Sequence, residues 1–127
     1  MVNDGDVVCM DKITIRGNIP SKANCYKIIT IAGHGSLAKT QAVKDYEDAF
    51  YYQCPIRDKN IDRPFRLTAD VYFKSNQPDL DNAFKLLLDC LQFCHVIKND
   101  RLCLEIQARK LIDKEDPRIE FTLEELI

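Results

Sequence analysis

Residues 65–94, FRLTADVYFKSNQPDLDNAFKLLLDCLQFC, contain the change of period that decides the fold. In residues 65–74 apolar and polar side chains alternate, which is typical of a strand with one buried face. The SNQP segment turns the chain. From residue 80 to residue 95 the apolar side chains recur every three or four positions, which predicts an amphipathic helix. The apolar side of this helix consists of Phe84, Leu87, Leu88, Leu91 and Cys94.

The same patterns recur on both sides of this stretch. Residues 11–17, DKITIRG, alternate as a strand, and residues 28–36, IITIAGHGS, predict one short strand that ends in a glycine-rich turn. Thr40 is a candidate N-cap for a helix over residues 41–53. Residues 102–112 and 118–126 are expected to form an antiparallel pair joined by DKEDP. The inward side of the first helix is predicted to hold Val43, Tyr46, Ala49, Phe50 and Gln53.

This order of elements predicts an α+β fold, in which two main helices pack on one face of a small mixed or antiparallel sheet. The chain has 127 residues, of which 46% are hydrophobic and 30% charged, as expected of one globular domain over residues 11–127 with an N-terminal extension over residues 1–10. No apolar run approaches the roughly 20 residues of a membrane span. Residues 1–12 have neither a basic start nor a long apolar run, so we expect a cytoplasmic protein without membrane partners.

The six cysteines do not predict a metal site. Most lie inside apolar patterns and no export signal is visible, so reduced, mostly buried thiols are expected, with a disulfide framework as the alternative. Cys90 and Cys94 lie one helical turn apart, with His95 adjacent, but no second ligand pair has the spacing of a zinc site. Core packing is the expected role of these cysteines.

Charge is distributed unevenly along a chain whose net charge is −2. Residues 11–66 carry ten bases and six acids, whereas residues 67–127 carry eight bases and twelve acids. This split fits a phosphate-binding surface beside a carboxylate cluster. Two separately solvated faces would give the same pattern, so charge alone leaves both interpretations open.

The opening of the second helix concentrates acidic side chains. Asp79 follows Pro78 in the turn or at the N-cap, and Asp81 falls in the first turn. Lys85 and Asp89 continue from Asp81 at intervals of four residues, so these three share one helix face. The acids could simply complement the helix dipole within a solvent-facing charge ladder. Alternatively, two adjacent carboxylates that repel each other are suited to bind Mg²⁺.

The expected strand pairing adds a third carboxylate, Asp100, to this group. The segment KND places Asp100 at the entry to the strand that follows the second helix. If that strand pairs beside residues 70–74, Asp100 is expected to come close to Asp79 and Asp81.

The segment DLDNAFKLLLDCL, followed by KND, resembles the signature of the RusA-type Holliday-junction resolvases, small bacterial and phage endonucleases. More loosely, IPSKANCYK resembles the Pro-Ser-x-x-Asn loop of that family, and GHGSLAKT leads into a helix that resembles its next helix. The resemblance runs from about residue 11 to residue 124.

The resemblance implies a function and assigns roles to residues. Asp79, Asp81 and Asp100 would be ligands of a divalent metal, Mg²⁺ with Mn²⁺ as a substitute, and Lys85 would be the catalytic lysine, with Asn82 supporting the site. The expected activity is Mg²⁺-dependent resolution of four-way DNA junctions by a homodimer that makes paired symmetric nicks in recombination and repair. The candidate DNA contacts are Arg16, Lys22, Asn24, Lys27, Lys39, Lys44 and Asn82.

One departure from the resembled family keeps two alternatives open. Its well-studied members are basic, whereas this chain is slightly acidic. A catalytically inactive protein of the same fold that binds branched DNA is one alternative. A metal-dependent phosphohydrolase that acts on another phosphoester is the second.

Overall fold

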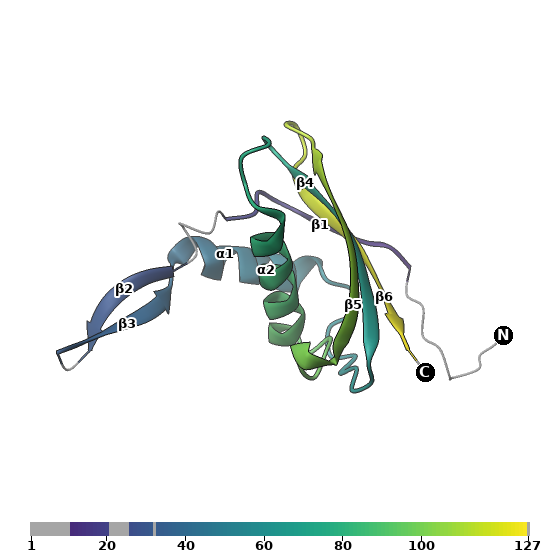
Figure 1. Cartoon of the computed structure of the whole chain (residues 1–127), viewed down its shortest axis with the longest axis horizontal. Helices are drawn as coiled ribbons and strands as arrows, with labels where there is room; N and C mark the ends of the chain where they lie inside the picture. Colours follow the sequence, from purple (N-terminus) through teal and green to yellow (C-terminus); the bar gives the residue numbers. More distant parts are fainter. Residues whose placement is uncertain (1–10, 21–25, 32, 127) are drawn as a thin grey trace.

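The structure is a computed structural model that describes residues 11–20, 26–31 and 33–126 (Figure 1). Predicted α+β character is confirmed, because two helices accompany a four-stranded mixed sheet and a separate two-stranded sheet. In chain order the elements are β1 (Ile13–Arg16), β2 (Tyr26–Ile31), β3 (His34–Lys39), α1 (Gln41–Gln53), β4 (Phe65–Phe73), α2 (Leu80–Phe93), the short 3₁₀ helix η2 (Asp100–Leu102), β5 (Cys103–Ile112) and β6 (Arg118–Glu125).

The strand order in the larger sheet is β1-β6-β4-β5. β4 is antiparallel to β6 and parallel to β5. The predicted pairing of the last two strands with each other is therefore wrong, because β4 lies between them. All five inward side chains of β4 are buried. The backbone N–H and C=O groups of such a strand are best paired at the centre of a sheet, where a neighbouring strand lies on each side.

The predicted single strand over residues 28–36 is also corrected. The chain forms the hairpin β2–β3 there, with a register that runs from Tyr26 opposite Lys39 to Ile31 opposite His34. Gly33, in the connection, has a φ of 82°, a conformation that glycine adopts without steric cost. The hairpin projects away from the body of the molecule (Figure 1).

Both helices cover the same face of the four-stranded sheet (Figure 1). α1 has the predicted bounds, and Thr40 caps it by accepting a hydrogen bond from the Val43 N–H. The inward side of α1 differs from the prediction, because Ala49 is exposed whereas Glu47 is buried. The buried residues of α1 are Val43, Tyr46, Glu47 and Phe50.

α2 begins where predicted and ends two residues early, at Phe93. The end is set by His95, whose φ of 56° is left-handed, and by the Val96 N–H, which donates to the Leu91 carbonyl. Phe84 and Leu88 are only partly buried. The fully buried side chains of this helix are Ala83, Leu86, Leu87, Cys90 and Leu91.

The described cysteines are reduced. Cys54, Cys90 and Cys94 are buried in the core, and Cys103 is partly buried, whereas Cys9 and Cys25 lie outside the described residues. None of the helices in the described part of the chain is long and apolar enough to cross a membrane.

Candidate active site at helix α2

Asp79 and Asp81 stand exposed at the start of α2. Asp79 occupies the N-cap position, but its side chain makes no capping hydrogen bond. Asp81 lies in the first turn, and its Oδ1 accepts the Asn82 N–H at 2.9 Å. Capping therefore does not account for the Asp79 carboxylate, and both acids face solvent at a helix end.

Asn82 ties this helix end to the segment that follows β1. Its Nδ2 donates to the Pro20 carbonyl at 3.1 Å. This contact fixes the chain beside the two aspartates, and the supporting role that the resemblance implies for Asn82 stays a prediction.

Lys85 and Asp89 follow along α2, beside a small cavity of about 20 Å³, room for about one water molecule. Burial raises the pKa of Asp89, and the positive charges of Lys85 and Lys39 oppose that shift. Asp89 is thus partly enclosed, and the predicted charge ladder is solvent-facing only in its first part. The cavity is lined by Lys39, Val43, Glu47, Asn82, Lys85, Leu86 and Asp89.

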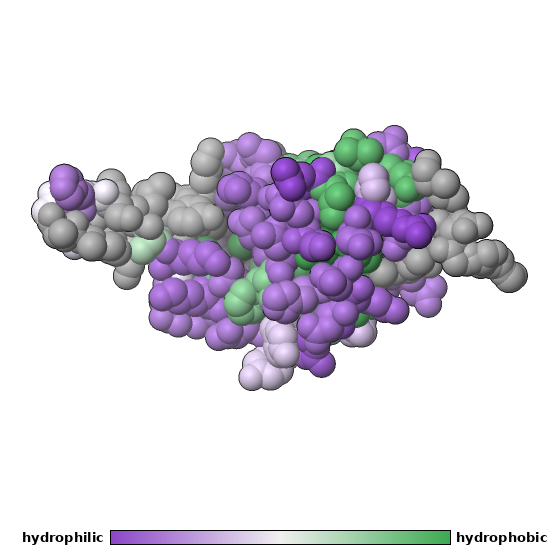
Figure 2. Space-filling view, turned by 90° about the horizontal axis from the view of Figure 1, so that it is seen from below, coloured by the Kyte–Doolittle hydropathy of each residue, from purple (hydrophilic) through white to green (hydrophobic). Residues whose placement is uncertain are grey.

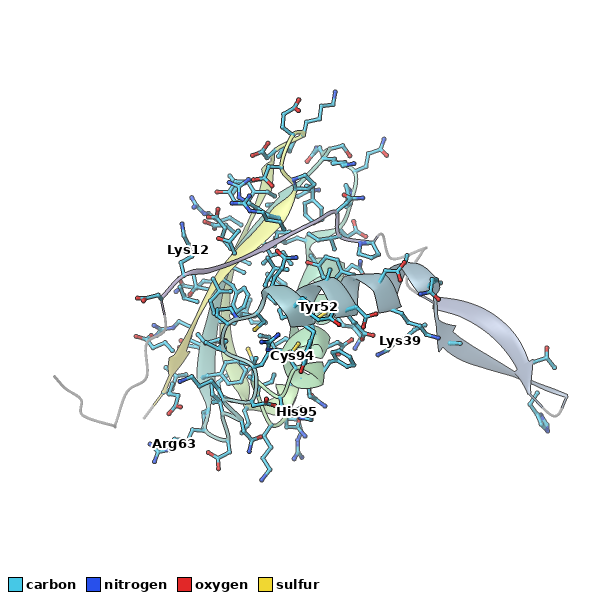
Figure 3. The ribbon with its side chains drawn as sticks, turned by 180° about the vertical axis from the view of Figure 1, so that it is seen from behind. Lys12, Lys39, Tyr52, Arg63, Cys94 and His95 are labelled. Atoms are coloured by element: carbon cyan, nitrogen blue, oxygen red, sulfur yellow. The ribbon has the colours of Figure 1, made fainter. Side chains whose placement is uncertain are left out.

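Glu47 joins the helices to the hairpin. Its carboxylate is 6% exposed and lies 2.7 Å from the Lys39 ammonium. Lys39 is the last residue of β3 and lies at the base of the hairpin, beside α1 (Figure 3). The sequence prediction did not include Glu47 on the inward side of α1. The available signal was its spacing, four residues after Val43 and three before Phe50.

Asp100 lies at the other end of α2. It is the first residue of η2, and its N–H donates to the Gln92 Oε1 at 3.1 Å. Burial is the main cause of the raised pKa of Asp89, and the negative charge of Asp100 raises it further. Residues 81 and 92 are separated by about 16 Å along a helix that rises 1.5 Å per residue.

The expected approach of Asp100 to Asp79 and Asp81 therefore does not occur within one described chain. The strand after α2 does pair beside β4, as the prediction required, but in parallel. It starts where β4 starts, whereas Asp79 follows the point where β4 has ended. Among the described residues, no group of three His, Cys, Asp or Glu side chains is close enough to hold a metal ion.

The candidate DNA contacts that the structure describes lie on different elements. Arg16 is paired with Asp116, and Lys39 is held by Glu47. Lys44 is exposed on α1. Lys22 and Asn24 lie outside the described residues, and of Lys27 the structure describes only the backbone in β2. Of this set, Lys39 and Asn82 lie beside the predicted catalytic Lys85.

A comparison with protein-family models gives a match over residues 27–124 to the family described as endodeoxyribonuclease RusA. The matched region extends from the hairpin to the last strand and includes Asp79, Asp81, Lys85 and Asp100. The comparison with curated proteins gives no match.

Proposed function

The chain belongs to the endodeoxyribonuclease RusA family, and from this membership we propose that it is a Mg²⁺-dependent endonuclease that resolves four-way DNA junctions as a homodimer. The observation that carries the proposal is the start of α2. Asp79 and Asp81 are exposed there, the Asp79 side chain makes no capping hydrogen bond, and Lys85 follows one turn after Asp81. Hydrolysis of a phosphodiester needs carboxylates that can bind a metal ion and a positive charge that can contact the phosphate.

The chemistry divides between the carboxylates and the lysine. When bound, Mg²⁺ would supply an activated water and neutralise charge on the phosphate, and Asp79 and Asp81 would be two of its ligands. The Lys85 ammonium stabilises the negative charge that develops on the phosphate oxygens. Asn82 holds the helix end in place through the Pro20 carbonyl.

The position of the third predicted ligand, Asp100, supports the homodimer of this proposal. One described chain keeps Asp100 about 16 Å along the helix from Asp81. A second copy related by a two-fold axis, with its α2 antiparallel to the first, would bring its own Asp100 toward Asp79 and Asp81. Such a dimer has two equivalent sites, as two symmetric nicks require.

The surface beside α2 is suited to a second copy. β5 is the edge strand of the four-stranded sheet, and Leu104 and Ile106 on it are 64% and 45% exposed. Figure 2 shows hydrophobic residues grouped on the sheet side of an otherwise mainly hydrophilic lower face. Apolar side chains on an unpaired strand edge are typical of a surface that another chain covers.

The proposal is tested by nicking of a synthetic mobile four-way junction in the presence of Mg²⁺. Wild-type protein is compared with Asp81→Asn and with the matched control Asp48→Asn, which changes an exposed carboxylate on α1. We expect Asp81→Asn to lose activity by a factor on the order of 100 or more, because a metal ligand is lost, and to retain junction binding. An intact junction with wild-type protein, or equal cutting by Asp81→Asn, would refute the proposal.

The slightly acidic net charge of −2 favours one alternative, a protein that binds branched DNA without cutting it. Such a protein would bind the junction and leave it intact at every concentration of divalent ion. The same assay therefore separates the two functions.

A further inference from the structure

An open groove runs along the last turns of α2, next to the small cavity at Lys85. Its volume is about 330 Å³, and it is lined by Lys39, Asp89, Gln92 and Phe93. Sites for small organic groups have volumes from roughly 300 Å³ upward. Lys39 and Asp89 line both spaces, so the groove lies directly beside the predicted catalytic lysine.

Phe93 supplies an aromatic surface in this groove. It belongs to the last turn of α2 and is 46% exposed, although its helix neighbours Cys90, Leu91 and Cys94 are buried. The core therefore does not need this ring. Exposed aromatic rings in a groove with positive charge are the platforms on which unpaired bases stack.

Lys39 supplies the positive charge and is held in place. Its ammonium lies 2.7 Å from the Glu47 carboxylate, which is 6% exposed. The buried carboxylate fixes the position of the ammonium, so a phosphate that enters the groove meets a charge already in position. Glu47 is thus a positioning residue for Lys39.

Asp89 and Gln92 supply a hydrogen-bond acceptor and a donor. The Gln92 Oε1 accepts the Asp100 N–H at 3.1 Å, which sets the orientation of the amide and leaves its Nε2 as a donor. The carboxyl oxygens of Asp89 can accept hydrogen bonds. An acceptor and a donor one turn apart are the groups needed to contact the edge of a base that has left the stack.

We propose that this groove holds one unpaired nucleobase of the DNA substrate. The base stacks on Phe93, Lys39 contacts its phosphate, and Asp89 and Gln92 contact its edge. The inference rests on the proposed function and adds a source of selectivity to it. A base leaves the stack at least cost where pairing is already broken, so the groove favours a branch point over intact duplex. Through Gln92, the occupied groove is linked to the backbone of Asp100.

A double-mutant cycle between protein and DNA tests the proposal. Junction binding is measured by fluorescence anisotropy in Ca²⁺, with two junctions: an intact one and one with abasic sites in place of the nucleotides that flank the crossover. For the intact junction we expect Phe93→Ala to weaken binding about tenfold, because one stacked base is lost. For the abasic junction we expect wild type and Phe93→Ala to bind equally. Phe93→Trp should bind the intact junction as wild type does.

Tyr52→Ala is the matched control, because Tyr52 is 80% exposed on α1 and does not line the groove. It should bind both junctions as wild type does. Equal loss by Phe93→Ala on both junctions, or no loss on either, would overturn the proposal. Sedimentation of Phe93→Ala as a monomer while wild type is a dimer would also overturn it, because the ring would then belong to a subunit interface.

Failure of this proposal and failure of the proposed nuclease have different signatures. If the cycle shows coupling but the wild type never nicks the junction, only the nuclease proposal fails. If wild type and Phe93→Ala nick and bind alike, only the groove proposal fails.

Discussion

At the scale of single residues, the Glu47–Lys39 pair is asymmetric. The Glu47 side chain is 6% exposed, whereas that of Lys39 is 43% exposed. If Glu47 is neutralised, the Lys39 ammonium can turn to water. If Lys39 is removed, the Glu47 carboxylate stays buried without this partner, which is the costlier state.

We therefore predict that Lys39→Met lowers the free energy of unfolding by about 2 kcal/mol and Glu47→Gln by about 1 kcal/mol. Urea denaturation measures both values. Lys44→Met, at an exposed position of α1, is the control and should change stability by less than about 0.5 kcal/mol. A larger loss for Glu47→Gln than for Lys39→Met would contradict the asymmetry.

The raised pKa of Asp89 makes the free energy of unfolding depend on pH. Burial raises its pKa above the ordinary 3.8, so the folded chain binds a proton there more readily than the unfolded chain. The contribution of Asp89 to stability therefore falls as pH rises from about 3.8 through the raised pKa. We predict that Asp89→Asn is more stable than wild type at pH 7 and that the difference shrinks toward pH 4.

Asp70→Asn is the control of opposite sign. The Arg109 side chain, which hydrogen-bonds Asp70, lowers the pKa of that carboxyl, so its stabilising effect is present at neutral pH and lost as pH falls through the lowered value. This variant should be less stable than wild type at pH 7. Urea denaturation at pH 4 and pH 7 measures both variants. The stability difference of Asp70→Asn should stay nearly constant between these pH values, because both lie above the lowered pKa of Asp70. A difference for Asp70→Asn that shrinks toward pH 4 as that of Asp89→Asn does would exclude the assignment.

Candidate site residues differ in how visible they are in the sequence. Asp81 and Lys85 could be placed on one helix face because their spacing is local, whereas their roles in a site stay predictions that come from the family resemblance. Glu47, Gln92 and Phe93 could not be assigned, because their surroundings come from the hairpin base and from η2, which are distant in sequence. A charged residue at an inward helical position is visible, but its partner is not.

At the scale of elements, the two helix starts provide a matched pair. Thr40 caps α1 through the Val43 N–H, whereas the Asp79 side chain at the N-cap of α2 makes no such bond. We predict that Thr40→Ala lowers the free energy of unfolding by about 1 kcal/mol. Asp79→Ala should lower it by about 0.5 kcal/mol or less, since only its interaction with the helix dipole is lost.

Thermal or urea unfolding of these variants gives the comparison, and Mn²⁺ titration calorimetry reports binding. Asp79→Ala is expected to lose Mn²⁺ binding at little cost in stability, whereas Thr40→Ala should bind as wild type does. If Asp79→Ala is the less stable variant and binds Mn²⁺ normally, Asp79 is a cap and not a ligand.

Helix and strand positions were largely predictable from local pattern. The helix over residues 41–53 has the expected bounds and β4 ends one residue before the expected residue 74, because capping, periodicity and turn residues are all local. The sequence predicts one strand where the hairpin lies, because Ile28–Ile31 is more apolar than the return strand His34–Lys39. Only the pairing of the two strands identifies the second one.

At the scale of the whole molecule, the separation of Asp100 from Asp81 makes a prediction about mixed dimers. If each site combines Asp79 and Asp81 of one copy with Asp100 of the other, Asp81→Asn and Asp100→Asn should each inactivate both sites. A mixed dimer of the two variants should regain one intact site. We predict that mixing the two inactive variants restores junction nicking and the binding of about one Mn²⁺ per mixed dimer.

Asp48→Asn is the control for the substitution itself: because Asp48 lies outside the proposed site, this variant alone should nick the junction as wild type does. As a second control, Asp81→Asn is mixed with a double variant that carries Asp81→Asn and Asp100→Asn. Neither site of this mixed dimer has an intact Asp81, so it should stay inactive. No recovery in the first mixture, with dimer exchange shown by sedimentation, would mean that each site lies within one chain.

The sequence by itself determined both helices, most of the strands, the α+β class and the line of acids and lysine on α2, because capping, periodicity and spacing act over a few residues. Only the tertiary structure decided that β4 separates the last two strands and pairs with β5 in parallel. That parallel pairing places Asp100 at the far end of α2, beside Gln92 and the groove of Phe93. Strand order depends on which strand pairings form the most backbone hydrogen bonds and bury the most apolar surface. These pairings join segments that are distant in sequence, so no local pattern predicts them.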